Sequence, residues 1–199
     1  MKYVSIDIET TGTNPIAHDI IEFAAVIDEI GSQKQLDKLP IFHKFIKKPS
    51  PYICDAEAII MHQRIFEKLS SKDEDEDTIF IEDLMYSFGN FLENNGISSN
   101  KYGTTIINVA GKNFGVFDYQ FLKEKIPANQ WNNISFRHRF IDPSILYHED
   151  EDNCLPDLKT CVQRMHREIG GSNFEWKNHN AVDDAIQIVR LIRHKIKSY

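Results

Sequence analysis

The chain begins with blocks of apolar residues that are separated by short polar stretches. Blocks at 2–8, 19–30 and about 40–47 predict three strands, and their short connections favour an antiparallel start to a sheet. Further on, apolar residues recur at helical spacing in five segments, at 54–69, 78–96, 117–126, 155–170 and 180–197. Short strands are expected at 104–111 and 139–142, and the acidic run at 70–77 is expected to be a solvated loop.

Strands followed by alternating helices and strands predict an α/β fold with three layers, in which helices flank a mixed central sheet. The chain has 199 residues, of which 41% are hydrophobic, so one good-sized core and a single domain over 1–199 are expected. No apolar run approaches the ~20 residues of a membrane span. The N-terminus lacks the apolar core of a secretory signal, and a cytoplasmic location is therefore expected.

The net charge of −7 disfavours broad, non-specific binding to duplex nucleic acid, which depends on Lys and Arg. It does not exclude a small site at which metal ions supply the positive charge. The three cysteines are widely spaced and form no metal-binding pattern, which suggests reduced thiols.

The first strand carries two acids, Asp7 and Glu9, whose i and i+2 positions place them on one face. Burying unpaired like charges is costly. A shared proton, a basic partner or a divalent cation would relieve the repulsion, and residues 3–12 contain no Lys or Arg. In the simplest alternative, one of the two acids faces solvent at the end of the strand.

Two later segments add candidates. Asp118 follows a strand and a glycine-rich turn at the start of a helix, where an acid also interacts favourably with the helix dipole alone. His179 precedes the last helix, whose first turns carry Asp183 and Asp184. Adjacent helix positions diverge by about 100°, and Asp184 lies nearer the apolar stripe, so Asp183 is expected to face solvent. Taken alone, His179 reads equally well as a surface histidine.

These segments, "SIDIETTG", "GKNFGVFDYQFL" and "HNAVDDA", resemble in order the three motifs of the DEDDh 3′–5′ exonucleases. The resemblance covers nearly the whole chain and implies a ribonuclease H-like fold. Asp7 and Glu9 match the acids of the first motif, Asp118 that of the second, and Asp184 with His179 the third. The second motif departs from the family pattern, because four residues separate Asn113 from Asp118 and Lys112 stands in place of a histidine. This departure leaves the role of Asn113 open.

The resemblance implies two divalent cations, Mg²⁺ or Mn²⁺, held by Asp7, Glu9, Asp118 and Asp184, with His179 as the general base. Water would attack the last phosphodiester of a single-stranded DNA or RNA 3′ end, and a nucleoside 5′-monophosphate would leave. The turn of Thr10, Thr11 and Gly12 could bring backbone close to the terminal sugar, because glycine allows near approach. The stretch "AIIMHQRIF" resembles the family segment that touches the terminal nucleotides, which implies that role for Met61 and His62. Lys112 is a candidate phosphate contact. Met61 could instead belong to the helix core and His62 to the helix surface.

The alternative function is a catalytically silent nucleic-acid-binding module with the same fold. The residues do not distinguish DNA from RNA. Several relatives are dimers, so a homodimer is an expectation by analogy. A polymerase partner is allowed but not indicated, because Tyr199 follows soon after Asp184 and a C-terminal polymerase-binding extension is therefore not expected.

Overall fold

The computed structural model describes residues 1–71, 75–171 and 180–196. Its centre is a five-stranded sheet in the order β4-β3-β2-β1-β6. The strands are β1 (Lys2–Thr10), β2 (Ile20–Glu29), β3 (Ile41–Lys47), β4 (Thr78–Phe80) and β6 (Val109–Ala110). β1, β2 and β3 pair antiparallel, whereas β6 pairs parallel with β1 and β4 parallel with β3. The sheet is therefore mixed, and the antiparallel start is confirmed.

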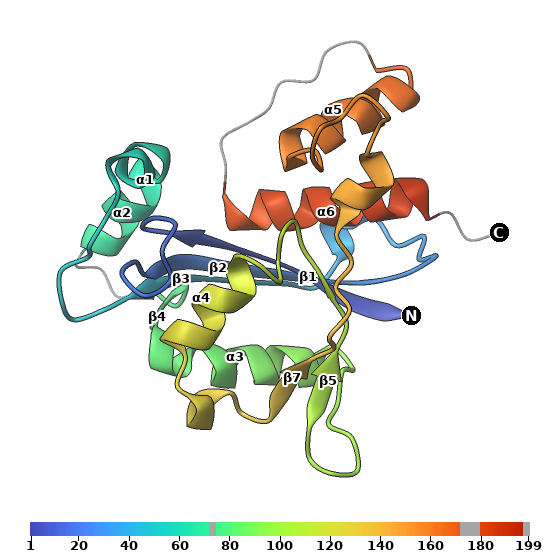
Figure 1. Cartoon of the computed structure of the whole chain (residues 1–199). Coiled ribbons are helices and arrows are strands. Elements are labelled where there is room, and N and C mark those ends of the chain that lie inside the picture. The colour runs from blue at the N-terminus through green and yellow to red at the C-terminus, as the bar shows by residue number, and fades with distance from the viewer. Residues whose placement is uncertain (72–74, 172–179, 197–199) are drawn as a thin grey trace.

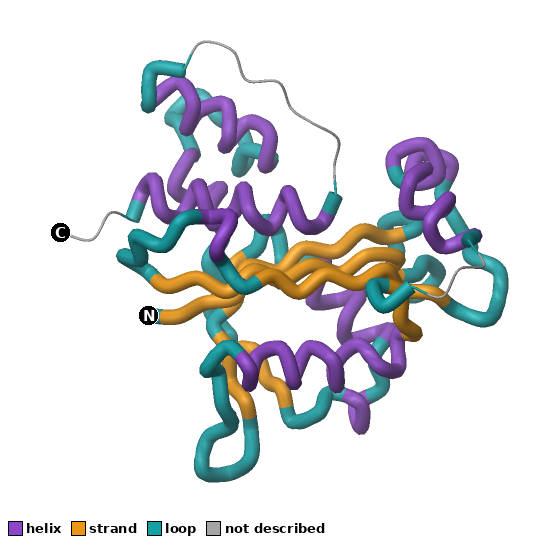
Figure 2. Tube along the Cα trace, turned by 180° about the vertical axis from the view of Figure 1, so that it is seen from behind, coloured by secondary structure: helices purple, strands orange, loops and turns teal. Residues whose placement is uncertain are grey.

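Helices cover both faces of this sheet (Figures 1 and 2). Helices α3 (Ile81–Asn94) and α4 (Asp118–Lys125) lie on one face, and α5 (Leu158–Glu168) and α6 (Ala181–Lys195) on the other. The prediction of a three-layer α/β fold is confirmed. None of the helices in the described part of the chain is long and apolar enough to cross a membrane.

Side chains of β1 alternate between the two helical layers. Val4, Ile6 and Ile8 are buried in the core that includes α3 and α4. Tyr3 belongs to the core beneath α5 and α6, so the odd-numbered residues of the strand, among them Asp7 and Glu9, face the α6 side. The face that carries the two acids is thus the face that α6 covers.

Three further parts complete the fold. Helices α1 (Ala56–Met61) and α2 (Gln63–Ser70) form a lobe at one end of the sheet, and β5 (Thr105–Ile107) and β7 (Ile134–Phe136) form a separate parallel pair (Figure 1). Short 3-10 helices cover Leu36–Lys38, Ala128–Gln130 and Pro143–Tyr147. Asp142 caps the last of these, because its carboxylate accepts a hydrogen bond from the Ser144 amide at 2.9 Å.

The structure corrects the predicted helices at two places. The helix expected at 54–69 is broken at His62, whose φ of −108° and ψ of 25° leave the helical region. This break turns His62 into the protein, where it is 5% exposed. The helix expected at 78–96 begins only at Ile81, because residues 78–80 pair with β3 as an edge strand.

The strands predicted at 104–111 and 139–142 also differ from those observed. The segment 104–111 forms two strands in different sheets, β5 and β6, separated at Asn108. The strand expected at 139–142 is reduced to a single parallel bridge between Ile141 and Ala110. The regular strand lies earlier, at β7, where Ile134 and Phe136 are buried on one side.

Candidate active site

Three carboxylates converge where β1 ends beneath the start of α6. Oxygen atoms of Asp7, Glu9 and Asp184 all lie within 4.8 Å of one another. Asp184 is 8% exposed, and the side chain of Glu9 is 12% exposed. The sequence prediction that Asp7 and Glu9 share one face therefore agrees with the geometry, and Asp184 is the aspartate of its pair that joins them.

Two contacts hold the start of α6 over the sheet, and a third caps the helix. The Ser5 hydroxyl, on the same face as Asp7, donates to the Ala185 carbonyl oxygen at 2.9 Å. The Ala181 amide donates to Glu22 Oε2 at 3.0 Å. The Asn180 side chain caps the helix by accepting a hydrogen bond from the Asp183 backbone amide at 2.8 Å. These contacts fix the rotation of the helix, which turns Asp184 inward and Asp183 outward.

Asp118 approaches the cluster from the edge of β1. Strand β6 pairs with β1 at Val4 and Ser5, and among the described residues the backbone of β1 beyond them has no strand partner on that side. The chain leaves β6, turns, and returns at the start of α4. There Asp118 Oδ1 accepts a hydrogen bond from the Ile8 amide at 3.1 Å. Asp118 is 4% exposed. Its buried carboxylate therefore provides the acceptor that the Ile8 amide needs at this edge of the strand.

The electrostatics of these acids are unfavourable when no cation is bound. Burial raises the pKa of Asp7 well above its usual range, and the carboxylates of Asp118, Glu9, Asp184 and Glu22 raise it further. Burial likewise raises the pKa of Glu9, with Asp184 as the strongest charged neighbour. Burial raises the pKa of Asp118 to about 7, although backbone amides oppose this shift. Several buried carboxylate oxygens that repel one another suit a hard divalent cation, so the residues fit the predicted metal site.

The segment after Glu9 is shaped by internal contacts. The β1–β2 register shifts between Glu9 and Thr10, a bulge of the kind that often redirects side chains beside active sites. The Thr10 hydroxyl donates to the Gly12 carbonyl and the Thr11 hydroxyl to the Ile53 carbonyl, at 2.7 and 2.6 Å. A Cβ on Gly12 would lie 2.4 Å from side-chain atoms of His18 and Asp55, so close packing explains this glycine. Both threonine hydroxyls donate their hydrogen bonds within the protein. The backbone of this turn is therefore the part that can contact the predicted nucleotide.

Met61 and His62 line a hollow of about 510 Å³ between the α1–α2 lobe, β2, β3 and the start of α6. Met61 is 58% exposed, which excludes the alternative that it belongs to the helix core. His62 is buried, which excludes an exposed position, and its Nε2 lies 3.5 Å from Glu9 Oε2. The histidine therefore connects the hollow with the acidic cluster. The volume is within the usual range for small-ligand sites.

Lys112 and Asn113 lie in the turn before α4. Asn113 has a φ of 56°, in the left-handed region that asparagine tolerates better than most residues. Its amide donates to Asp142 Oδ2, and its carbonyl accepts from the Val116 and Phe117 amides. This turn geometry accounts for Asn113 without a role in the site. Lys112 is half-buried, close enough to Asp157 for its charge to lower the pKa of that carboxyl, although hydrogen bonds from Thr160 lower it most.

The site contains one further acid, Glu22, which the sequence analysis did not select. Glu22 lies on β2 directly opposite Glu9, is 2% exposed, and has its Oε1 2.6 Å from His43 Nε2. Nearly every residue of β2 is buried, so no alternation of polar and apolar residues marks Glu22 as inward-facing. His179, the predicted general base, lies outside the described residues.

Two substitutions test how Glu22 holds α6. Glu22→Gln and Glu22→Ala both remove the charge, but only glutamine keeps an acceptor for the buried Ala181 amide. Leaving a buried amide without its acceptor costs about 1–3 kcal/mol. We therefore expect the alanine variant to be less stable than the glutamine variant by about that amount, measured by urea unfolding in chelator. Equal stabilities would contradict the assigned contact.

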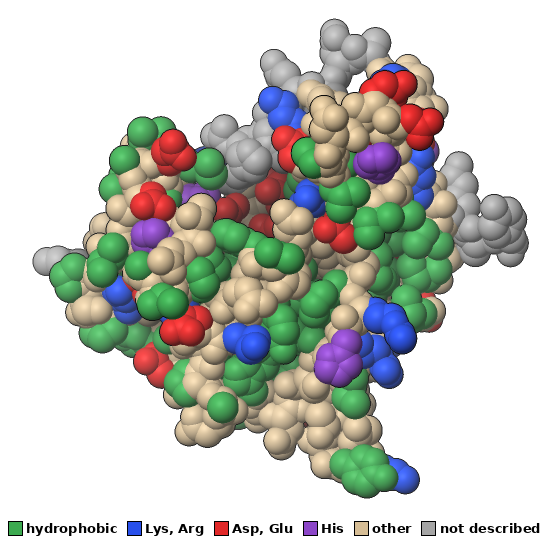
Figure 3. Space-filling model, in the orientation of Figure 1, with side chains coloured by type: hydrophobic (Ala, Val, Ile, Leu, Met, Phe, Trp, Pro, Cys, Tyr) green, Lys and Arg blue, Asp and Glu red, His purple; other side chains and the backbone are tan. Residues whose placement is uncertain are grey.

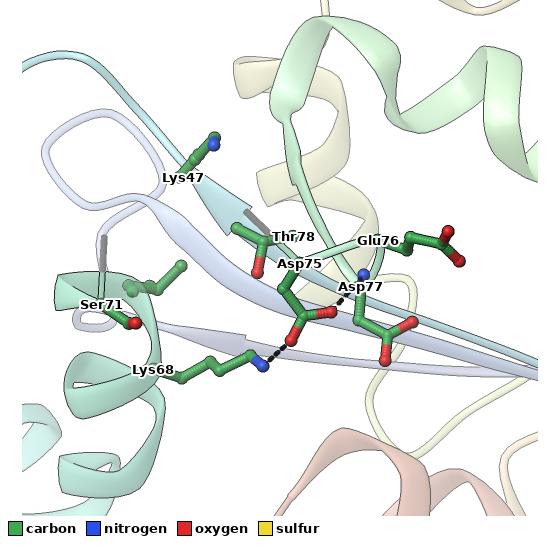
Figure 4. A pocket seen from close by; sticks show the side chains of 8 residues that line it. Lys47, Lys68, Ser71, Asp75, Glu76, Asp77 and Thr78 are labelled. Carbon is green, nitrogen blue, oxygen red and sulfur yellow. Dashed lines mark hydrogen bonds and ion pairs between the residues drawn. The ribbon is translucent and has the colours of Figure 1, made fainter. Parts of the chain in front are cut away.

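A second hollow, of about 500 Å³, lies beside α2 and β4 and is lined mainly by charged and polar residues (Figure 4). Its charges are already satisfied in part, since the Lys68 ammonium pairs with Asp75 and the Asp77 amide donates to the same carboxylate. It lies apart from the converging acids, and we assign it no role.

We compared the chain with protein families, curated sequences and solved structures. A sequence model of the exonuclease family (RNase T) matches residues 4–192. No curated protein sequence matches. Among solved structures, cell-death related nuclease 4 (CRN-4) superposes with a TM-score of 0.61 at 14% identity, covering 96% of this chain and 62% of that one. E. coli exonuclease I in complex with a dA16 oligonucleotide superposes with a TM-score of 0.59 at 13% identity, covering 98% and 41%.

This chain thus spans less than two thirds of the length of either structure. At such low identity the superpositions establish the fold, which is that of the exonucleases. The family match extends over almost the whole chain and confirms the family resemblance drawn from the motifs. The chain belongs to the RNase T family of exonucleases.

Proposed function

We propose that this protein is a metal-dependent 3′–5′ exonuclease of the DEDDh type that removes nucleotides from single-stranded DNA or RNA. The observation that carries the proposal is the convergence of Asp7, Glu9 and Asp184, with Asp118 at the edge of the same strand. In this proposal the four acids hold two cations, Mg²⁺ or Mn²⁺. Such a pair, when bound, stabilises both the attacking and the leaving oxygen of a phosphodiester.

Residues of the chain would bind the nucleotide, orient a metal ligand and accept a proton. The hollow lined by Met61 and His62 would hold the terminal nucleotide, with the exposed Met61 side chain against a base. His62 would orient Glu9, because its ring lies within 3.5 Å of that carboxylate. His179 would take the proton of the attacking water, a task that suits a side chain with a near-neutral pKa. The 3′ oxygen of the preceding nucleotide would leave, releasing a nucleoside 5′-monophosphate.

A set of labelled oligonucleotides tests this proposal. Single strands of matched DNA and RNA sequence, incubated with Mg²⁺, Mn²⁺ or chelator, should release mononucleotides only with metal and only from the 3′ end. A 3′-terminal phosphorothioate linkage should slow this release, whereas the same linkage at the 5′ end should not. Strand binding without metal-dependent release would favour the silent binding module, and cleavage of circular strands would indicate an endonuclease.

A further inference from the structure

A short basic segment lies away from the acidic site. β7 is followed by Arg137, His138 and Arg139, all exposed, and flanked by Phe136 and Phe140. From Lys125 to Ile141 the chain contains no acidic residue, although the whole protein carries a net charge of −7. We call Arg137, His138 and Arg139 the basic patch. Its local charge is opposite to that of the protein as a whole.

The two guanidinium groups of the patch are available. Other arginines are engaged with carboxylates: Arg164 pairs with Asp152 and Arg193 with Asp28, each at 2.5 Å. Within the described ranges, neither Arg137 nor Arg139 forms an ion pair or a side-chain hydrogen bond. Unpaired arginines on one short segment attract anions, and their planar donor fork fits phosphate and carboxylate groups.

An apolar hollow of about 650 Å³ accompanies the patch, with Ile106, Phe140 and Ile141 among its lining residues. Ile106 is 42% exposed. Phe140 is half-buried and is held in place by Phe114, with the two ring centroids 5.0 Å apart. Cationic groups beside a fixed aromatic ring are the combination by which proteins bind single-stranded nucleic acid, phosphates on the cations and bases on the ring.

The patch lies within reach of the acids. Ile141 is level with Ala110, which is level with Ser5 of β1, and both bridges are parallel. With strands about 4.8 Å apart and about 3.3 Å per residue, the Cα atoms of Arg139 and Asp7 are separated by roughly 16 Å. Figure 3 shows both features on one face, the acidic recess beside the α1–α2 lobe and the basic side chains over the segment that follows β7.

We infer that the basic patch and Phe140 bind the 5′-ward part of a single strand whose 3′ end lies at the acids. This inference rests on the proposed function and names the part of the surface that holds longer substrates. Arg137 and Arg139 contact phosphates, and Phe140 stacks against a base. An acidic peptide would also be attracted to the arginines, but it would not extend from the acidic recess, and it has no base to stack on Phe140.

The test compares the double variant Arg137→Gln/Arg139→Gln with Arg190→Gln, an exposed arginine on α6 for which the described residues offer no ion pair. Binding of single strands of about 4 and about 16 nucleotides, a span typical of single-strand sites, is measured in chelator over a range of salt. The double variant should bind the longer strand about tenfold more weakly and the shorter strand unchanged. Its salt slope should become shallower by about 1.4, the value for two lost phosphate contacts.

In the presence of metal, the double variant should show a raised KM on the longer strand with kcat unchanged. Arg190→Gln should match the wild type throughout. Equal binding of the longer strand by wild type and double variant would overturn the inference, and so would an acidic peptide of equal charge that competes better than a nucleic acid strand. If the protein hydrolyses nothing but the arginines still govern binding, the patch stands and the proposed catalysis fails.

Discussion

Replacing Asp7 with asparagine should lower metal-dependent mononucleotide release by about a hundredfold to a thousandfold while the protein stays folded. Asp7 lies in the centre of the acidic cluster, within 4.8 Å of both Glu9 and Asp184. In the proposed site it contributes directly to holding the cations, and loss of one preorganised electrostatic group typically costs about 10² to 10³ in rate. Release of labelled mononucleotides under single-turnover conditions measures the effect.

The same substitution should not destabilise the metal-free protein. The pKa of Asp7 is raised by burial and by four neighbouring carboxylates, so its negative charge works against the fold at neutral pH. Asparagine has nearly the same shape and removes that charge. Thermal unfolding in chelator should therefore occur at an equal or higher temperature in Asp7→Asn than in wild type.

Asp183→Asn is the matched control for this experiment. Asp183 is exposed and precedes Asp184 in the chain, and its carboxylate accepts a hydrogen bond from the side-chain amide of the cap residue Asn180. Its substitution should leave the rate within a few-fold of wild type. If Asp7→Asn retained activity within tenfold of wild type, or lost no more than Asp183→Asn, the metal assignment would be wrong.

Whether an acid of the site could be predicted from the sequence depends on the residue pattern around it. In β1, charged and apolar residues alternate, and the period of two places Asp7 and Glu9 on one face without knowledge of the fold. The sequence distinguishes the inward-facing Asp184 from Asp183 because its neighbour Ala185 belongs to the apolar stripe of α6. In the structure Ala185 is 0% exposed. In both cases the signal lies within one element, which is why sequence reasoning succeeded.

No local pattern identifies Glu22, and His62 was named only through the family resemblance. Glu22 is part of a strand that is buried on both faces, so its orientation depends on pairing with Glu9 and on the approach of α6 from a distant part of the chain. His62 enters the site because the helix breaks at it, and helical periodicity continues through that residue in the sequence. The short strands β6 and β7 were misjudged for a related reason, since two or three residues contain too little pattern to set a boundary.

The acidic cluster also predicts an unusual dependence of stability on pH. The pKa of Asp118 is about 7 in the folded protein and 3.8 is its ordinary value, so between these values the folded state binds more protons than the unfolded state. The free energy of unfolding should therefore fall as pH rises from about 4 to about 7. A shift of this size corresponds to an upper limit of roughly 4 kcal/mol for Asp118. Asp7 and Glu9, whose pKa values are also raised, act in the same direction.

Other carboxylates change the free energy of unfolding with pH in the opposite direction, and they do so in a different pH range. Hydrogen bonds from Arg193 and Tyr3 overcome burial to lower the pKa of Asp28, and ion pairing with Lys195 lowers that of Glu168. The stability that these groups contribute is lost only as pH falls below their ordinary values. Well above 4.5, the higher of their two ordinary pKa values, they stay ionised in both states, so the acidic cluster determines the slope there.

A divalent cation should reverse this slope, because it binds the ionised carboxylates of the folded protein and competes with protons for them. In chelator, the midpoint of thermal unfolding should fall between pH 5 and pH 7.5, and saturating Mn²⁺ should raise it more at the higher pH. At a concentration 100 times Kd, the ion adds about 2.7 kcal/mol at one site. Asp118→Asn should flatten the slope in chelator. A midpoint that rises with pH in chelator, or that Mn²⁺ leaves unchanged, would mean that these buried acids do not form a cation site.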